Sequence, residues 1–168
     1  MIMVRSELLG DHDPVRALNR QAFQGEGEAA LVDALRGTPR SISLVATLDS
    51  SVVGHIFFSP VEVIGPGSMM SIAGLGPMAV LPKCQRRGVG SQLVRAGVEE
   101  CRRLAYEAVV VVGHPSYYPR FGFVRASAFG LRCEFPVPDE AFMALSLGSE
   151  VLSGVGGVVK YLPQFAEV

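Results

Sequence analysis

The chain has 168 residues, of which 49% are hydrophobic and 18% are charged, and its formal net charge is −1. This size predicts a single domain spanning residues 1–168. A near-neutral chain without a basic face does not suit a nucleic-acid partner, and its apolar runs are too short to span a membrane. The chain begins without a signal-peptide pattern, and its three scattered cysteines form neither a disulfide framework nor a CxxC motif. We therefore expect a cytoplasmic protein without a metal site.

The first part of the chain predicts one strand and two helices. The strand covers residues 2–8. Asp13 suits the N-cap of the first helix, because its carboxylate can accept from free backbone N–H groups, and Pro14 suits the first helical position. A second helix runs from about residue 26 to residue 36. We expect this glycine-flanked segment either to line a substrate entrance or to be a plain connector.

Three strands then follow as a meander. Alternating apolar residues predict strands at 41–48 and 52–63, joined by a tight turn. Residues 69–80 form a long apolar strand that contains Gly76 and Pro77. Because proline cannot donate a ladder hydrogen bond and glycine weakens a strand, we expect a bulge or splay here that leaves backbone groups unpaired.

A basic, glycine-bearing turn at residues 83–91 connects this strand to a long amphipathic helix. Residues 108–112 after the helix are a continuous apolar run, which is typical of a parallel strand buried on both faces. Strand, turn, helix and strand together predict a right-handed βαβ unit. The turn presents free backbone N–H groups at the positive end of a helix, an arrangement that suits a phosphate or pyrophosphate.

The rest of the chain carries weaker patterns. Residues 116–123 predict one or two helical turns closed by Gly122. In chain order there follow a strand from residue 123, a loop at 127–139, a strand at 142–147, and a mostly irregular tail at 148–168 with a short strand at 158–161.

Two nucleotide-binding templates fail at the turn. A P-loop requires Gly-Lys-Ser/Thr at its end, and this turn has no such lysine. The dinucleotide fingerprint requires a third glycine, and Gln92-Leu93 follow Gly90 instead. The anion must therefore be bound in a different context.

Two spaced motifs give that context. They are Gln-x-x-Gly-x-Gly at Gln85, Gly88 and Gly90, and Tyr-x-x-x-Gly-Phe at Tyr118, Gly122 and Phe123. With the order of elements from residue 1 to about 147, they resemble the GNAT superfamily of N-acetyltransferases. The resemblance implies a three-layer α/β fold, with a central twisted mixed sheet that is splayed between the fourth and fifth strands and carries helices on both faces.

The resemblance also implies an activity and a cosubstrate. An acetyl group would move from acetyl-CoA to a primary amine of a small molecule or peptide, by direct attack in a ternary complex. The turn would hold the pyrophosphate, and the preceding strand would pair with the pantetheine arm. The residues implied are Met78, Ala79, Val80, Gln85, Arg86, Arg87, Gly88, Val89, Gly90 and Ser91.

Tyr118 corresponds to the family's tyrosine that protonates the departing thiolate. A phenol with a pKa near 10 suits a thiolate with a pKa of roughly 8–9. The general base stays open, because many relatives place a glutamate on the strand before the turn and residues 69–80 contain no acid. The candidates are Glu62, His55, His114, Glu134 or water. A non-catalytic acyl-CoA-binding or sensor domain is the alternative function.

The sequence leaves three further questions open. No pattern of acids identifies the acceptor amine, and acyl groups longer than acetyl are not excluded. A homodimer is one option, with an exposed final strand that could pair between two copies.

Overall fold

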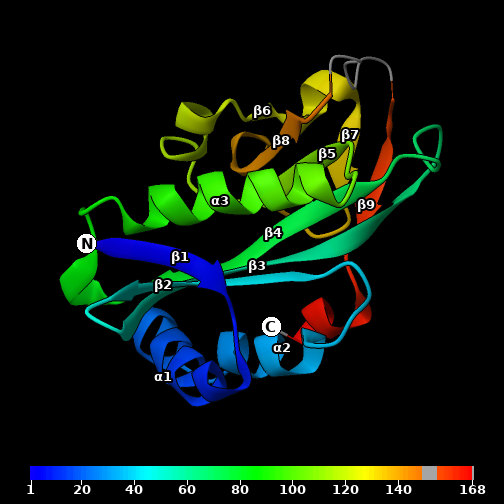
Figure 1. The fold of residues 1–168 in the computed structure, drawn as a ribbon. Coiled ribbons are helices and arrows are strands. Elements are labelled where there is room, and N and C mark those ends of the chain that lie inside the picture. The colour runs from blue at the N-terminus through cyan, green and yellow to red at the C-terminus, as the bar shows by residue number, and fades with distance from the viewer. Residues whose placement is uncertain (149–154, 168) are drawn as a thin grey trace. The chain divides into compact units, whose positions relative to one another are not determined.

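The structure is a computed structural model that describes residues 1–148 and 155–167 (Figure 1). Its residues form two compact units. The first contains Met1–Ser59, Gly76–Glu100 and the segment from Pro163, and the second contains Pro60–Leu75 and Cys101–Leu162. Strands β3 (Ser51–Ile64) and β4 (Ile72–Val80) each begin in one unit and end in the other.

The first unit is built on an antiparallel sheet. Strand β1 (Ile2–Ser6) pairs with β2 (Ile42–Leu48), and β2 pairs with the first part of β3. The register places Val45 opposite His55, and a bulge follows Ala46. This arrangement confirms the predicted hairpin.

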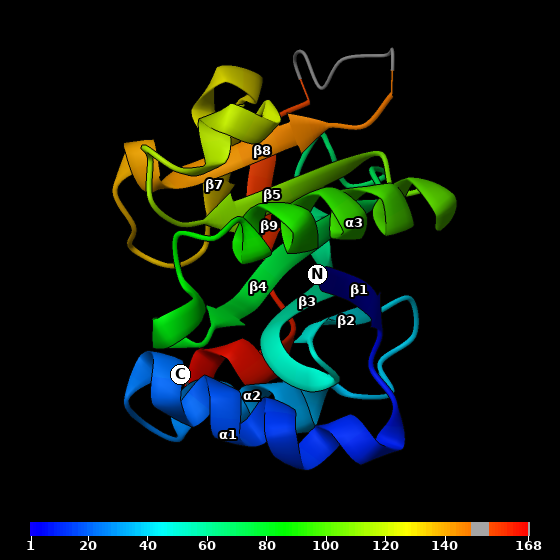
Figure 2. The same cartoon turned by 60° about the vertical axis from the view of Figure 1, so that its left-hand side comes forward.

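Helices cover both faces of this sheet (Figures 1 and 2). Helices α1 (His12–Phe23) and α2 (Gly27–Leu35) lie on one side, and α3 (Val89–Arg103) lies on the other. Helix α3 packs closely on β3: a Cβ on Gly54 would lie 2.8 Å from Val89 Cγ1 and 2.9 Å from Leu93 Cδ1. A side chain at position 54 would therefore prevent this close packing of α3 on the sheet.

The prediction that Asp13 caps α1 is wrong. The helix begins at His12, with Asp11 at the N-cap position. The Asp11 carboxylate accepts from the Leu8 N–H at 2.7 Å and binds the Arg5 guanidinium at 2.6 and 3.0 Å. This contact with β1 fixes the turn before the helix. Pro14 still lies in the first helical turn, where its missing N–H is not needed.

The second unit holds a mixed sheet. Strand β5 (Ala108–Val112) pairs in parallel with the first part of β4, which confirms the predicted βαβ unit. It also pairs antiparallel with β8 (Phe142–Ser146), and β8 pairs with β6 (Val124–Arg125). Buried apolar side chains such as Ile72, Val110 and Phe142 form the core of this unit.

The ladder between β4 and β5 runs from Ile72↔Ala108 to Leu75↔Val111, whereas β4 itself continues to Val80. The carboxyl half of β4 thus extends beyond this ladder, in agreement with the predicted splay. The Gly76 φ angle of +143° and Pro77 mark the point where the ladder stops.

The end of the chain is more regular than predicted. The expected loop at 127–139 contains part of the 3₁₀-helix η4 (Ala126–Phe129) and the strand β7 (Leu131–Cys133). The tail contains β9 (Gly157–Lys160) and the 3₁₀-helix η6 (Pro163–Glu167), while residues 149–154 of the predicted tail lie outside the described residues.

Strand β9 explains both differences. It pairs in parallel with β7 and antiparallel with the end of β3, so distant residues stabilise segments with weak local patterns. Both edges of this last strand are therefore paired, and the expectation that it is exposed for pairing between two copies is wrong.

No helix in the described part of the chain is long and apolar enough to cross a membrane.

Candidate functional site

The glycine-bearing turn between β4 and α3 is fixed firmly at its base. The Leu81 N–H donates to the Val53 carbonyl of β3 at 2.9 Å, and the Cys84 N–H donates to the Leu81 carbonyl at 2.8 Å. The first bond ties the turn to β3, and the second belongs to the 3₁₀-helix η2 (Pro82–Cys84), in which the Cys84 side chain is buried. Cys84 therefore packs as a small apolar residue.

Two residues of the turn have left-handed backbones. Gly88 has a φ of +83°, and a Cβ built on it would meet no atom within 4 Å. Glycine is thus favoured here by conformation, and the space in front of it is open. Arg86 has a φ of +64°, which costs a non-glycine residue about 1–2 kcal/mol. Strain of this kind is often found at functional sites, and no sequence signal indicated it.

The first turn of α3 provides hydrogen-bond donors. The Gln92 N–H donates to the Gly88 carbonyl at 3.0 Å and begins the helical ladder. The N–H groups of Val89, Gly90 and Ser91 precede that bond, and the N-terminal dipole gives them a partial positive charge. Arg86 is exposed just before them. This arrangement can bind a phosphate or pyrophosphate.

The end of β4 lies in the same unit as the turn. Met78 and Val80 are half-buried on one face of the strand, and Ala79 is buried on the other. The Gln85 side-chain amide donates to the Val80 carbonyl at 3.4 Å, which links the turn to the strand end. A strand that continues past its ladder can pair with an extended ligand.

Tyr118 lies in the second unit, at the start of the 3₁₀-helix η3 (Tyr118–Phe121). Its side chain is buried, with Tyr117 and Phe123 in edge contacts at ring-centroid distances of 5.1 and 5.6 Å. Burial raises the pKa of Tyr118 to about 12, so the phenol keeps its proton at neutral pH. Gly122 closes the turn with a φ of +97°, as predicted.

Among the candidate bases, three lie in the second unit. Glu62 is opposite Lys160 in the β3–β9 register, and Glu134 accepts the Tyr161 N–H at 2.6 Å. His114 is exposed after β5. Only Glu134 among these three thus has a hydrogen bond that competes with a role as base.

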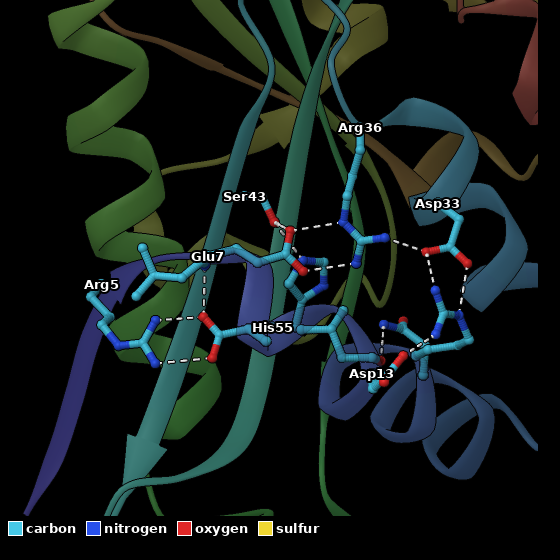
Figure 3. Close-up of polar contacts among 12 residues, drawn as sticks. Arg5, Glu7, Asp13, Asp33, Arg36, Ser43 and His55 are labelled. Atoms are coloured by element: carbon cyan, nitrogen blue, oxygen red, sulfur yellow. Dashed lines mark hydrogen bonds and ion pairs between the residues drawn. The ribbon is translucent and has the colours of Figure 1, made fainter.

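His55 belongs to a polar network in the first unit (Figure 3). It is fully buried, and its Nε2 atom lies 2.8 Å from Ser43 Oγ. Ser43 Oγ donates to Glu7 at 2.9 Å, and Glu7 accepts two bonds from Arg36 at 3.0 and 2.8 Å. Arg36 also contacts Asp33. We refer to Glu7, Arg36, Ser43 and His55 as the Glu7–His55 network.

Charges in this network are set by burial and hydrogen bonds. Burial lowers the pKa of His55 to about 4, so the ring is neutral at pH 7. Burial tends to raise the pKa of Glu7, but hydrogen bonds from Arg36 and Ser43 outweigh it and leave that pKa lowered. A neutral imidazole engaged by a serine favours a structural role for His55, and sequence patterns gave no sign of this network.

Metal ligands do not gather in the described residues, where no group of three His, Cys, Asp or Glu side chains could hold an ion. The donor set fits a phosphorylated organic cosubstrate instead: backbone N–H groups, a glycine with open space and exposed arginines.

These features describe an α/β protein with a site suited to a phosphorylated cosubstrate: a mixed sheet, a strand that continues past its ladder, and a glycine turn before α3. Residues 4–126 match the family model of the acetyltransferase (GNAT) domain. The chain therefore belongs to the GNAT acetyltransferase family. This confirms the predicted family and enzyme class of acetyl-CoA-dependent N-acetyltransferase.

Relatives extend over the whole chain. The N-acetyltransferase YhbS of Escherichia coli K12, itself described as uncharacterized, is 37% identical over 98% of both chains. The crystal structure of YhbS from Escherichia coli in complex with CoA has a TM-score of 0.91 and covers 98% of this chain and 92% of that one. A GNAT acetyltransferase from Brucella melitensis in complex with acetyl-CoA is 32% identical, with a TM-score of 0.79 and 98% coverage of both chains.

Proposed function

We propose that this chain transfers the acetyl group of acetyl-CoA to a primary amine of a small molecule or peptide. The observation that carries the proposal is the turn before α3, where Gly88 is left-handed with open space beside it and the helical ladder begins only at Gln92. Two relatives of the same family have structures with CoA or acetyl-CoA, which supports the same cosubstrate for this chain.

In the proposed complex the turn holds the pyrophosphate. The backbone N–H groups of residues 87–91 donate to it, and Arg86 and Arg87 add positive charge nearby. Gln85 supports the turn through its bond to Val80. Residues 78–80 align the pantetheine arm, and the N–H of Met78 or Val80 stabilises the charge that develops on the thioester oxygen.

Bound acetyl-CoA supplies the thioester carbonyl that the amine attacks directly in the ternary complex. The nitrogen–carbon bond forms, the carbon–sulfur bond breaks, and Tyr118 donates its phenolic proton to the leaving sulfur. The amine gives up its own proton to a base or to water. Glu62, His55, His114, Glu134 and water all stay candidates, and the Glu7–His55 network makes His55 the less suitable histidine.

A non-catalytic acyl-CoA-binding or sensor domain is the second candidate function. Two features favour it, because both concern candidates for the general base: β4 contains no acidic residue, and the Glu134 carboxylate already accepts a backbone N–H.

A homodimer would need a surface other than β9, both edges of which are paired. The three free cysteines of the chain favour the reducing cytoplasm as the location of this protein.

Two measurements test these proposals. Acetyl-CoA should raise the melting temperature of the chain, and an unchanged melting temperature would remove the cofactor assignment. Release of free CoA thiol in the presence of a panel of primary amines then separates the functions. Amine-dependent release identifies an enzyme, whereas binding without release for any amine favours the sensor.

A further inference from the structure

Gly113, which directly follows β5, lies against the ring of Tyr118. A Cβ built on Gly113 would lie 2.3 Å from Tyr118 Cε2 and 2.9 Å from Cδ2. Real Cβ atoms essentially never come within 3.0 Å of another heavy atom in this way. The ring therefore occupies the space that any side chain at position 113 would need.

The glycine at this position is required by the ring and not by the backbone. Gly113 lacks the positive φ that favours glycine at Gly88 and Gly122, so its conformation would accept other residues. Its N–H donates to the Ala141 carbonyl at 2.9 Å, which holds the backbone in place. A side chain at position 113 would consequently displace Tyr118 more readily than the strand end.

Aromatic residues confine the ring further. Tyr117 and Phe123 meet it edge-on, and the Tyr117 ring is itself covered by the Arg120 guanidinium, 4.6 Å from the ring centroid. The Arg120 Nε also donates to the Tyr117 carbonyl at 2.9 Å. Tyr118 is thus enclosed by Gly113 and an ordered aromatic group, which leaves its ring little freedom to tilt.

We propose that Gly113 is a positioning residue for Tyr118, and that its missing side chain sets where the phenolic O–H points. The inference rests on the proposed role of Tyr118 as the proton donor to the leaving sulfur. Restoring ordinary contact with a Cβ requires a ring shift of roughly 1 Å, and a displacement of this size can cost up to about 100-fold in rate.

The test is Gly113→Ala. We expect a 10- to 100-fold lower turnover (about the range a displaced catalytic group costs) with acetyl-CoA affinity unchanged. The same change in a Tyr118→Phe background should lower turnover no further. Wild-type turnover in Gly113→Ala, or an equal loss in both backgrounds, would overturn the proposal.

A readout independent of activity is the ultraviolet titration of the Tyr118 phenol, taken as the difference from Tyr118→Phe. In Gly113→Ala the displaced phenol should titrate at a lower pH than in the wild type, because its pKa is raised by burial. An unchanged titration would contradict the contact. If Tyr118→Phe alone keeps full turnover, the proposed acid fails, while this titration still decides whether Gly113 positions the ring.

Gly67→Ala is the matched control in the same unit. Its Cβ would lie 2.3 Å from Val155 Cγ1, the same overlap as at Gly113. It should lower the melting temperature and leave turnover per folded molecule and the Tyr118 titration unchanged. If Gly113→Ala does not fold, the same substitution is made in a Tyr118→Ala background, which lacks the ring. Failure to fold in that background as well would overturn the contact.

Discussion

The Nε2 atom of His55 lies 2.8 Å from Ser43 Oγ in the interior of the first unit. The Ser43 hydroxyl donates to Glu7, because an ionised carboxylate can only accept. Ser43 Oγ must then accept from His55, which fixes the proton of the neutral ring on Nε2. Gly54 faces α3, so His55, one residue later in β3, faces the side of α1 and α2. The network thereby joins the residue that follows β1 to β2, β3 and the end of α2.

Replacing Ser43 by alanine should leave the His55 N–H buried without its acceptor. We expect a loss of about 1–3 kcal/mol in the free energy of unfolding, measured by urea denaturation. Ser51→Ala is the control, because Ser51 is exposed at the start of β3 and should change stability by less than about 0.5 kcal/mol. Equal effects of the two substitutions on stability would show that the hydrogen bonds of the Ser43 hydroxyl do not stabilise the fold.

Arg36→Met should destabilise the chain more strongly. The Glu7 side chain is only 4% exposed, so loss of the guanidinium leaves a buried carboxylate without its cation. We expect a cost of about 3–5 kcal/mol in urea unfolding. A Glu7→Leu change added to Arg36→Met should recover much of it.

Arg125→Met serves as the control for this prediction. The Arg125–Asp139 pair is exposed on both sides, and its loss should cost at most about 1 kcal/mol. If Arg36→Met is no worse than Arg125→Met, then Glu7 does not depend on its ion pair.

His55 should make stability depend on pH in the acid range. Its pKa is about 4 in the folded chain, below the ordinary value of 6.5, because burial disfavours the charged ring. Between these values the unfolded chain binds the extra proton, so stability falls as pH falls from 6.5 towards 4, by up to roughly 1.4 kcal/mol per pH unit. Glu7, whose folded pKa is lowered, loses its contribution at still lower pH.

The measurement is the difference in unfolding free energy between wild type and His55→Gln across this range. The glutamine keeps an N–H donor for Ser43 and cannot titrate, so its stability should fall less steeply with acid. His12→Gln is the control, since His12 is half-exposed at the start of α1. Parallel pH profiles for wild type and His55→Gln would refute the assignment of a neutral buried His55.

Sequence patterns predicted the turns at Gly88 and Gly122 well, because the requirements of these turns are local. Gly88 needs a left-handed backbone, Gly122 closes a helical turn, and both lie in motifs of fixed spacing. Arg86 shares the left-handed conformation of Gly88, yet arginine gives no local sign of it. Residue type thus reveals a glycine that the backbone requires, but it does not reveal a non-glycine residue whose surroundings hold it in a strained conformation.

The features that sequence reasoning missed depend on distant partners. Asp11 replaces Asp13 before α1 because Arg5 on β1 binds its carboxylate. The Glu7–His55 network joins a residue just after β1, one residue each from β2 and β3, and the residue after α2, and each appears in the sequence as an isolated polar residue. The same holds for Gly113. Its backbone does not require glycine, and the requirement comes from the Tyr118 ring, which belongs to the following helical turn.

Gly88→Ala should weaken acetyl-CoA binding beyond its effect on stability. Its left-handed backbone costs alanine about 1–2 kcal/mol, and the new methyl group would stand in the open space proposed for the pyrophosphate. We expect at least a tenfold higher Kd by isothermal titration calorimetry.

Gly37→Ala is the control that matches in both respects. Gly37 has a φ of +85°, and a Cβ on it also meets nothing within 4 Å. Both variants should therefore lose similar stability, but only Gly88→Ala should lose affinity. Wild-type acetyl-CoA affinity in Gly88→Ala would contradict the proposed phosphate site.

Tyr118→Phe should lower turnover by about 100-fold or more, because a general acid contributes at least that much to many reactions. Acetyl-CoA affinity should stay near the wild-type value, since the ring and its edge contacts with Tyr117 and Phe123 are retained. Thiol release at saturating acetyl-CoA measures the first quantity, and calorimetry measures the second. Tyr117→Phe tests whether the neighbouring phenol carries the proton instead. A full rate in Tyr118→Phe with a reduced rate in Tyr117→Phe would assign the general acid to Tyr117 instead of Tyr118. Full rates in both variants would mean that water protonates the sulfur.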